Sequence, residues 1–423
     1  MPEQTKTEHL SGGLDVAEAQ ACILEKLAPL GVEQVVLERA LGRVLAADVL
    51  ANRDLPPCDV SAMDGYAVRA ADVTAAPVAL KMVDDIKAGD TPKTAVAAGQ
   101  CARIMTGAPV PQGADSVVRV EDTRALPDGS IEFAVVAKPG NDIRLRGENM
   151  RVGDVALSVG TEITPAVVGA LAAVKAATAT VYRLPSVAIL ANGDELEALD
   201  EPFDPARIPD SNTWALLAQT QAQGIEPTRL GIARDKPEEL ARHLERGLQY
   251  DVLLVAGGTS VGVHDHVRPV LEKLGVVMHF WRVEMRPGHP IAFGTTERGI
   301  VFCLPGNPVS AMVCFEQFVL PALRALTGHR TLFRRTLAAR LTQPVKSRPG
   351  RVEFVRVTLT QEADGSYAAT PVGAQGSADV LAMARAEGLL IAPREGKGLP
   401  AGAIAPVQLL DGATFQRAAE IER

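Results

Sequence analysis

The sequence is poor in aromatic residues and in cysteine, and both shortages limit what it can encode. Only 4% of the 423 residues are aromatic, so the cores have to rest on Ala, Val and Leu. The five cysteines are widely spaced, and no C-x-x-C pair occurs. This distribution disfavours a disulfide framework and a cysteine zinc site, and it predicts a protein of the reducing cytoplasm.

Positive charge and long apolar runs are also scarce. The formal net charge is −8. Binding to nucleic acid requires a basic face, so we expect no nucleic-acid partner. The first 13 residues are polar and lack the apolar centre of a signal peptide. No uninterrupted apolar run approaches the roughly 18 residues of a membrane span, so no membrane association is expected.

The length predicts several domains, and hydrophobic periodicity suggests where they lie. Helical spacing near the start is carried by Val16, Ala19, Ile23, Leu27 and Leu30. Thr164 before Pro165 predicts the N-cap of a helix over 164–181. We predict one discontinuous helical domain from residues 11–56 and 150–183. The β-rich segment 57–149, whose short apolar runs are separated by Gly, Pro and Asp, interrupts it.

The second half of the chain changes pattern twice. From 184 to 327, short apolar strands alternate with helical patterns, which favours a mostly parallel sheet covered by helices. From 328 to 423, short strands and turns return, with a hairpin signal at Ala363–Gly365, and predict a small β-barrel or sandwich.

Polar residues follow the strands of the predicted parallel sheet, where ligands of such sheets bind. Three acids, Glu195, Asp235 and Asp265, fall at that edge. Beside them, the turn residues Gly257, Gly258, Thr259 and Ser260 offer backbone N–H groups and hydroxyls to an anion. Carboxylates near a phosphate indicate Mg²⁺, which proteins hold through one or two acids plus substrate oxygens.

Simpler interpretations stay open for these features. A Gly-Gly turn after a strand is common, and no Walker motif is present. Asp265 also suits a helix N-cap, because an apolar helical stripe follows it. Metal binding by His264, Asp265 and His266 is disfavoured, since consecutive side chains in an extended loop point apart.

Three further stretches carry candidate residues. Arg286 and His289 flank a Pro-Gly turn and suit an oxyanion, although a surface turn explains them equally well. In "SAMDGYAV", Asp64 is either a turn former or a site acid. In "RIMTGAPVP", Thr106 is either a capping hydroxyl or a ligand contact.

Taken together, these stretches resemble one family, the molybdopterin molybdenumtransferases (MoeA), which are similar to the E domain of gephyrin. The resemblance covers nearly the whole chain, in family order. It is carried by "SAMDGYAV", "RIMTGAPVP", "IRLRGEN", "NGDEL", "DSN", "GGTSVG", "RPGHPIAFG", "LPGNPVSA" and "PGRVEFVR".

The resemblance implies a fold and a reaction. The fold is an α/β multidomain one: an elongated helical domain with an inserted β-rich domain, a central parallel MogA-like α/β domain and a C-terminal β-barrel. The reaction inserts molybdate into adenylylated molybdopterin, requires Mg²⁺, and yields molybdenum cofactor and AMP. The family acts as a homodimer whose active cleft crosses the interface. Molybdopterin adenylyltransferase and cofactor-accepting molybdoenzymes are possible partners.

The resemblance also assigns roles to residues. Asp64, Thr106, Glu195, Asp235 and Asp265 correspond to catalytic positions, and the last three acids to the metal site. Pro305 and Pro308 correspond to the loop that shapes the cleft. The residues that would grip molybdate are Ser260, Arg286, His289, Arg351 and Ser377.

Four positions depart from the family pattern. Arg286 and His289 stand where lysines are more frequent, and a histidine there would make oxyanion binding depend on pH. Asn149 replaces an acid, and Val60 replaces a polar residue. Two rival hypotheses remain: a molybdopterin adenylyltransferase, which resembles the α/β domain alone, and a non-catalytic scaffold. A variant that prefers tungstate is also conceivable.

Overall fold

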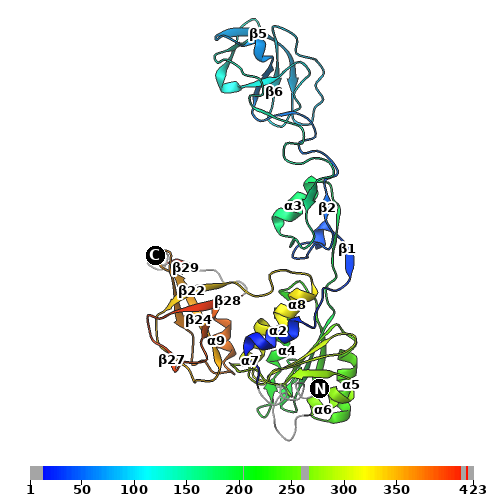
Figure 1. Ribbon diagram of the computed structural model, residues 1–423, viewed down its shortest axis with the longest axis vertical. Coiled ribbons are helices and arrows are strands. Elements are labelled where there is room, and N and C mark those ends of the chain that lie inside the picture. Colours follow the sequence, from blue (N-terminus) through cyan, green and yellow to red (C-terminus); the bar gives the residue numbers. More distant parts are fainter. Residues whose placement is uncertain (1–12, 203, 259–265, 411–415, 418–423) are drawn as a thin grey trace, which may run out of the picture. The chain divides into compact units, whose positions relative to one another are not determined.

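The computed structural model describes residues 13–202, 204–258, 266–410 and 416–417 (Figure 1). The chain divides into two compact units. We call residues 34–41 and 47–179 the β-rich unit, and residues 1–33, 42–46 and 180–423 the α/β–barrel unit. Each is described by itself.

The β-rich unit is built on a mixed six-stranded sheet, counted over its described residues, in the order β7-β4-β6-β5-β9-β8. The apolar run "GYAV" forms β4, and the other predicted runs also lie in or overlap strands. Tyr66 and Phe133 meet edge to face in its core, with ring centroids 6.0 Å apart. The strands are β4 (Gly65–Val68), β5 (Val78–Ile86), β6 (Gln100–Ile104), β7 (Ser116–Arg119), β8 (Thr123–Ala125) and β9 (Ser130–Phe133).

Short pieces complete this part of the chain. The N-cap predicted at Thr164 is confirmed, because its Oγ1 accepts from the N–H of Val167. The helix ends at Ala173, earlier than predicted, since the alternating run that follows forms β12. After β1, the chain forms the short 3-10 turn η1. The pieces are β1 (Val32–Val36), η1 (Leu37–Arg39), β2 (Val49–Leu50), β3 (Val60–Ser61), η2 (Ala70–Asp72), η3 (Val120–Asp122), β10 (Ile143–Arg144), β11 (Val155–Leu157), α3 (Pro165–Ala173) and β12 (Thr178–Tyr182).

The α/β part of the second unit has a sheet in the order β16-β13-β17-β21-β20-β18. The first four strands are parallel, as predicted, and the side chains of the three inner ones, β13, β17 and β21, are buried. The antiparallel strands β20 and β18, which extend the sheet at one side, were not predicted. The strands are β13 (Val187–Asn192), β16 (Thr228–Ala233), β17 (Val252–Ala256), β18 (Val277–Phe280), β20 (Ala292–Thr295) and β21 (Ile300–Leu304).

Helices cover both faces of this sheet (Figure 1). One face packs against α5 (Pro237–Gly247) and α6 (Val267–Lys273). The other packs against α2 (Val16–Leu24), α4 (Ser211–Gln221) and the run α7 (Pro308–Cys314), η4 (Phe315–Val319) and α8 (Leu320–Leu326). The helix predicted at Val16 therefore belongs to this core and not to the discontinuous domain, because Ala19 and Ile23 are buried in it.

The continuous helix Pro308–Leu326 is long and apolar enough to cross a membrane by length and composition alone. However, 83% of its apolar window is buried within the protein. It is therefore the central helix of the α/β core, which explains its apolar composition.

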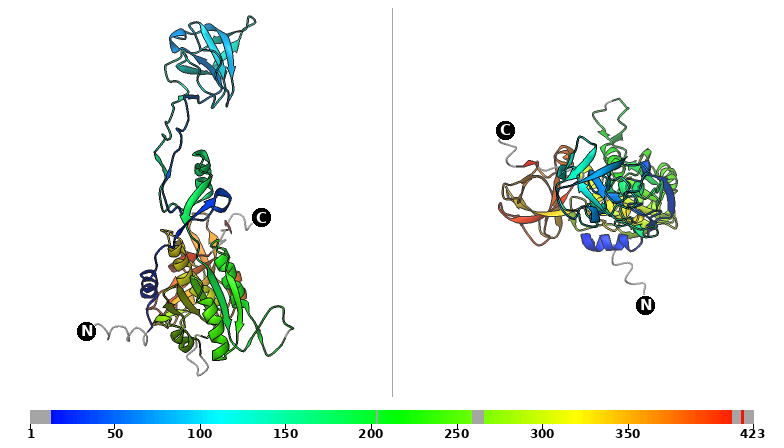
Figure 2. Two further views of the ribbon diagram at one scale, coloured as in Figure 1. Left: turned by 90° about the vertical axis from the view of Figure 1, so that its right-hand side faces the viewer. Right: turned by 90° about the horizontal axis from the view of Figure 1, so that it is seen from above.

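The C-terminal part is a closed barrel of five strands among the described residues, as predicted. The pairing runs β24-β25-β22-β28-β26 and returns to β24, and the strands form a ring when seen from above (Figure 2, right). The hairpin predicted at Ala363–Gly365 joins β24 to β25. The strands are β22 (Thr336–Leu341), β24 (Val352–Gln361), β25 (Tyr367–Pro371), β26 (Gly388–Ala392) and β28 (Ile404–Leu409).

Smaller elements flank the barrel and the sheet. β19 pairs in parallel with β24, which places Arg286 beside Glu353. The elements are β14 (Leu196–Glu197), β15 (Ile208–Pro209), β19 (Met285–Arg286), β23 (Val345–Lys346), α9 (Val380–Ala384), β27 (Gly398–Leu399) and β29 (Gln416–Arg417).

A partly buried charge cluster lies at the start of strands β13 and β17. Both Nη atoms of Arg183 donate to Asp251 at 2.9 Å, and the N–H and Oγ of Ser186 donate to the same carboxylate at 2.7 and 2.6 Å. These bonds hold the pKa of Asp251 well below its usual range, and those from Arg183 are the largest cause.

We expect the substitution Asp251→Asn to lower the thermal midpoint at pH 7, because charge-assisted hydrogen bonds of this kind contribute on the order of 2 kcal/mol. A carboxylate whose folded pKa is depressed stabilises the fold above its unfolded pKa of about 4, and this stability is lost as pH falls toward the folded value. The two midpoints should therefore converge below about pH 4 in differential scanning calorimetry. The exposed pair Arg124–Glu132 supplies a control, since Glu132→Gln should change little. Equal loss at all pH values would contradict the assignment.

Candidate functional site

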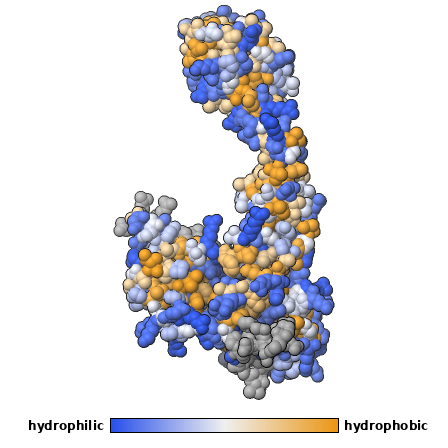
Figure 3. Space-filling model, in the orientation of Figure 1, coloured by the Kyte–Doolittle hydropathy of each residue, from blue (hydrophilic) through white to orange (hydrophobic). Residues whose placement is uncertain are grey.

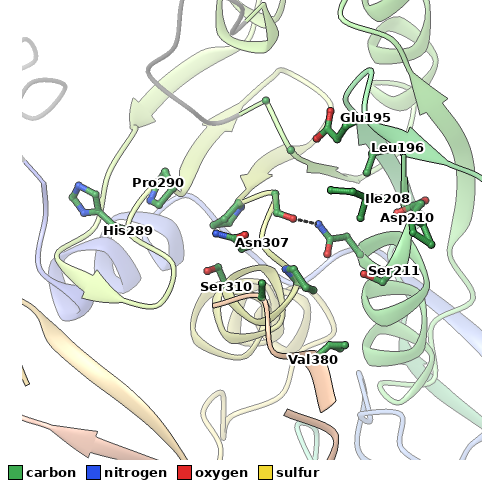
Figure 4. A pocket seen from close by; sticks show the side chains of 18 of the residues that line it. Glu195, Leu196, Ile208, Asp210, Ser211, His289, Pro290, Asn307, Ser310 and Val380 are labelled. Carbon is green, nitrogen blue, oxygen red and sulfur yellow. Dashed lines mark hydrogen bonds between the residues drawn. The ribbon is translucent and has the colours of Figure 1, made fainter. Parts of the chain in front are cut away.

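A cavity of about 1020 Å³ opens at the carboxyl edge of the parallel strands, between the α/β sheet and the loop that precedes α9. In Figure 4, His289 and Pro290 lie at one end of it, and Leu196, Ile208 and Asp210 lie at the other. The described residues that line it are Glu195, Leu196, Ile208, Pro209, Asp210, Ser211, Asn212, Gly257, Gly258, Arg282, His289, Pro290, Pro305, Gly306, Asn307, Pro308, Ser310, Ala378 and Val380.

The Gly257–Gly258 turn forms one wall of the cavity, and the backbone at both positions favours glycine. Both glycines have a positive φ, +97° and +66°. A Cβ on Gly257 would lie 2.3 Å from the carbonyl oxygen of Asn192, and one on Gly258 would lie 2.2 Å from Val267. The turn thus brings bare backbone to the cavity, which suits a bound anion. Thr259 and Ser260 lie outside the described residues.

The three predicted acids differ in position. Glu195 lines the cavity. Asp235 is not among its lining residues; its carboxylate accepts from Nδ2 of Asn192 at 2.5 Å and from the N–H of Asp194 at 3.3 Å. Asp265 lies outside the described residues, among which no cluster of three or more His, Cys, Asp or Glu is placed to hold a metal ion.

The loop Pro305–Pro308, which contains both prolines assigned to the cleft, lines the cavity next to the glycine turn. Pro308 is the first residue of α7. Proline has no backbone N–H, but that group would have no acceptor within the helix at this position. The Nδ2 of Asn212 donates to the Gly306 carbonyl at 2.7 Å (dashed line in Figure 4). The N–H of Val309 donates to the carbonyl of Ser377 at 3.1 Å, so the loop is fixed from α4 and from the barrel side.

A second, smaller pocket of about 530 Å³ lies where β19 meets the barrel. Its described lining combines three arginines with two glutamates: Arg286, Arg348, Arg351, Glu284 and Glu353. Arg286 donates to Glu353 at 3.2 Å, and Arg351 donates to Glu284 at 3.1 Å. The three arginines outnumber the two acids, so the pocket retains positive charge.

The predicted oxyanion grip is therefore distributed over two pockets. Arg286 and Arg351 share the smaller one, whereas His289 lines the larger cavity. The Pro-Gly turn between Arg286 and His289 sends the two side chains to different sides. The Nδ1 of His289 donates to the carbonyl of Val283 at 2.8 Å, which leaves Nε2 for other contacts. Ser260 lies outside the described residues, and Ser377 directly precedes the lining residue Ala378.

In the β-rich unit, the structure brings Asp64 and Thr106 together. Both the N–H and the Oγ1 of Thr106 donate to Oδ1 of Asp64, at 2.7 and 2.8 Å. These two bonds lower the pKa of Asp64, and the bond from the backbone N–H is the larger cause. Asp64 is therefore held as an exposed, ionised carboxylate.

Several lining residues of the two pockets were not predicted as candidates, and Arg348 and Asn212 illustrate why. Arg348 comes from an irregular segment before β24, where single-residue spacing carries no signal. Asn212 lies in the quoted "DSN" stretch, and its position at the first turn of a helix after a strand edge could have identified it.

The fold and the cavity define a class: a mostly parallel α/β domain with a cavity at its strand ends, fused to a β-barrel and accompanied by a β-rich unit. Family matches agree with this architecture. Residues 14–174 match the MoeA N-terminal region (domain I and II), residues 188–325 a probable molybdopterin binding domain, and residues 338–410 the MoeA C-terminal region (domain IV).

Whole-chain comparisons point the same way. The chain is 33% identical to a molybdopterin molybdenumtransferase of Haemophilus influenzae, over 92% of this chain and 96% of that one. Identity to the enzyme of the same name from Bacillus subtilis is 34%, over 94% of each. A crystal structure of a molybdopterin biosynthesis MoeA protein from Pyrococcus horikoshii is similar with a TM-score of 0.80 and 30% identity, over 95% of this chain and all of that one. The chain belongs to the molybdopterin molybdenumtransferase (MoeA) family.

The Asp64–Thr106 contact yields a test within the β-rich unit. We expect Thr106→Val to raise the pKa of Asp64 while leaving it below the usual range, because the backbone N–H bond survives. A ¹³C NMR titration of the carboxyl carbon measures this, and Thr106→Ser should restore the wild-type value. Thr123→Val is the control, since that hydroxyl donates to the carbonyl of Val120 and touches no carboxylate. An unchanged pKa in Thr106→Val would show that the hydroxyl does not stabilise the charge.

Proposed function

We propose that this protein is a molybdenum insertase: it transfers molybdenum from molybdate to adenylylated molybdopterin and releases AMP and molybdenum cofactor. Its place is in molybdenum cofactor biosynthesis, in the cytoplasm. Partner proteins would be the adenylyltransferase that supplies the substrate and the molybdoenzymes that accept the product. The observation that supports this most is the cavity at the carboxyl edge of the sheet, within a chain related over nearly its whole length to proteins named for this transfer.

The size and lining of the cavity suit a substrate with two ring systems and a phosphate bridge. Its volume of about 1020 Å³ lies at the upper end of small-molecule sites. The Gly257–Gly258 turn offers backbone N–H groups to the phosphates, and the apolar walls at Leu196, Ile208 and Val380 offer surfaces for ring systems. We assign Pro305 and Pro308 the role of keeping this wall rigid.

The acids fit a magnesium ion by the chemistry of their donors. Carboxylate oxygens are the ligands that Mg²⁺ prefers, and we propose that Glu195, Asp235 and Asp265 hold it. When bound, the ion would neutralise the phosphates and polarise the bond that breaks. Glu195 is poised for this role, since it lines the cavity beside the glycine turn.

Molybdate binding is assigned to the basic residues. The arginine-rich pocket with Arg286 and Arg351 suits a tetrahedral oxyanion, because guanidinium groups donate to two oxygens at once. Each arginine is paired to a glutamate in the structure, so binding would require an exchange of partners. His289, Ser260 and Ser377 complete the proposed grip. Asp64 and Thr106 are assigned to the same reaction.

A molybdopterin adenylyltransferase remains the alternative, because it would need only the α/β domain. The two reactions differ in nucleotide use: the adenylyltransferase consumes ATP, whereas the insertase releases AMP without it. A scaffold would bind the pterin without turnover. Side-by-side reactions with molybdate and tungstate would show metal preference.

The central test supplies purified protein with adenylylated molybdopterin, Mg²⁺ and molybdate. We expect AMP release and reconstitution of an apo-molybdoenzyme, without any need for ATP. Asp265→Ala should reduce AMP release by about 100-fold or more, as for other groups that stabilise transition-state charge, while the circular dichroism spectrum stays unchanged. Arg124→Gln, in an exposed ion pair of the β-rich unit, is the control. A wild-type protein that releases no AMP would contradict the proposed function.

We also propose that the protein is a homodimer, in which the β-rich unit of one subunit completes the cleft of the other. Exposed apolar side chains in the β-rich unit support this. Leu50 of β2 is 56% exposed and pairs across the strands with Val155 of β11, which is 50% exposed. Residues opposite each other in antiparallel strands share a face, so the two form one apolar patch. Figure 3 shows apolar side chains at the surface of the segment that carries β2 and α3.

The double substitution Leu50→Asp and Val155→Asp should shift the protein from dimer to monomer, because it places two charges in the proposed interface. Size-exclusion chromatography with light scattering measures the mass. Val277→Asp, at an equally exposed valine of the α/β sheet edge, should leave the dimer intact. A monomeric wild type would contradict the proposed homodimer, and a double variant that stays dimeric would place the interface elsewhere.

A further inference from the structure

Asn212 lines the large cavity, and only the NH₂ group of its side-chain amide has a hydrogen-bond partner among the described residues. It lies in the first turn of α4, lines the cavity, and is only 9% exposed. Its Nδ2 donates to the carbonyl of Gly306 at 2.7 Å. Because that partner can only accept, the amide cannot rotate by 180° without setting two oxygens against each other.

The other half of the amide has no partner. The Oδ1 of Asn212 is buried and finds no hydrogen-bond partner among the residues that the structure describes. Leaving a buried acceptor unsatisfied is costly, and such groups are rare in folded proteins. The side chain that carries this acceptor lines the cavity, so a ligand that displaces the atoms now covering Oδ1 can supply the missing donor.

We propose that Asn212 is a specificity-determining residue whose Oδ1 accepts a hydrogen bond from an amino group on a heterocyclic ring of the bound substrate. This rests on the proposed function. Adenylylated molybdopterin carries such a group twice, on its adenine and on its pterin. The shared chemistry is a ring N–H donor in a mostly apolar pocket, and an oxygen at the same position of the ring would face Oδ1 and be repelled.

The same helix provides a matched control in Gln219, seven residues further on. Its Nε2 also donates to α7 and the following π-helix, to the carbonyl of Met312 at 3.3 Å and to Oε1 of Glu316 at 2.9 Å. Its Oε1 is likewise buried without a partner among the described residues. Gln219, however, is not among the lining residues of the cavity. The two amides therefore join α4 to the α7 region in the same way, and only one of them can contact a ligand.

The experiment compares two ligand pairs in which an amino group is replaced by a carbonyl oxygen. These are AMP with inosine monophosphate, and pterin with lumazine, each titrated calorimetrically into the full-length protein. We expect the wild type to bind the amino member of one pair about tenfold or more tightly than its oxo partner, and that pair identifies the ring that Asn212 contacts. Asn212→Leu should abolish this preference, and Gln219→Leu should retain it.

The outcomes separate the assignment from the proposed function. A wild type that binds the ligands but discriminates within neither pair would overturn the role of Asn212, and this result requires no variant. Equal weakening of amino and oxo ligands in Asn212→Leu would also overturn it, since that is the signature of a structural role. A wild type that binds neither AMP nor pterin would instead contradict the proposed function, and the assignment with it.

Discussion

The site depends on one constraint: the backbone after β17 must turn within contact distance of the backbone after β13. Parallel strands end at a common edge, and the carbonyl of Asn192 leaves no room for a side chain on Gly257. Gly258 is confined in the same way by Val267, at the first turn of α6. A larger residue at either position would push the turn into the cavity. The wall of the site is therefore set by packing behind it and not by the residues that face a ligand.

Hydrogen bonds that cross between elements hold the wall formed by the Pro305–Pro308 loop and α7. Asn212 connects α4 to Gly306, Gln219 connects the same helix to the π-helix that follows α7, and the carbonyl of Ser377 accepts from Val309. Within the loop itself, the bond from Asn212 satisfies the carbonyl of Gly306. They also connect the sheet, the helices and the barrel at one place. The cavity thus inherits its shape from three parts of the fold, which explains why it lies at their meeting point.

Charge is distributed unevenly around this centre. The acids Glu195 and Asp235 follow the ends of β13 and β16, while three arginines gather where β19 meets the barrel, and two of them, Arg286 and Arg351, are paired with glutamates. Asp64 is stabilised as an anion within the β-rich unit by Thr106. Carboxylates attract cations and repel anions, whereas guanidinium groups attract oxyanions, so the acidic and basic regions suit different ligands.

The sequence alone determined the elements whose signals are local. Alternating strands and helices gave the parallel sheet, because buried strands and amphipathic helices differ in period, and Thr164–Pro165 fixed a helix start through its capping chemistry. The motifs of "LPGNP" and the Gly-Gly turn located one edge of the sheet. Only the tertiary structure decided which residues share a pocket. His289 and Arg286 lie in different pockets although they are three positions apart in the sequence, and Arg348 lines the smaller pocket from an irregular segment. The structure also decided that Val16–Leu24 packs into the α/β core. The physical reason is that a pocket is defined by distances between segments far apart in the chain, which single-residue patterns do not encode.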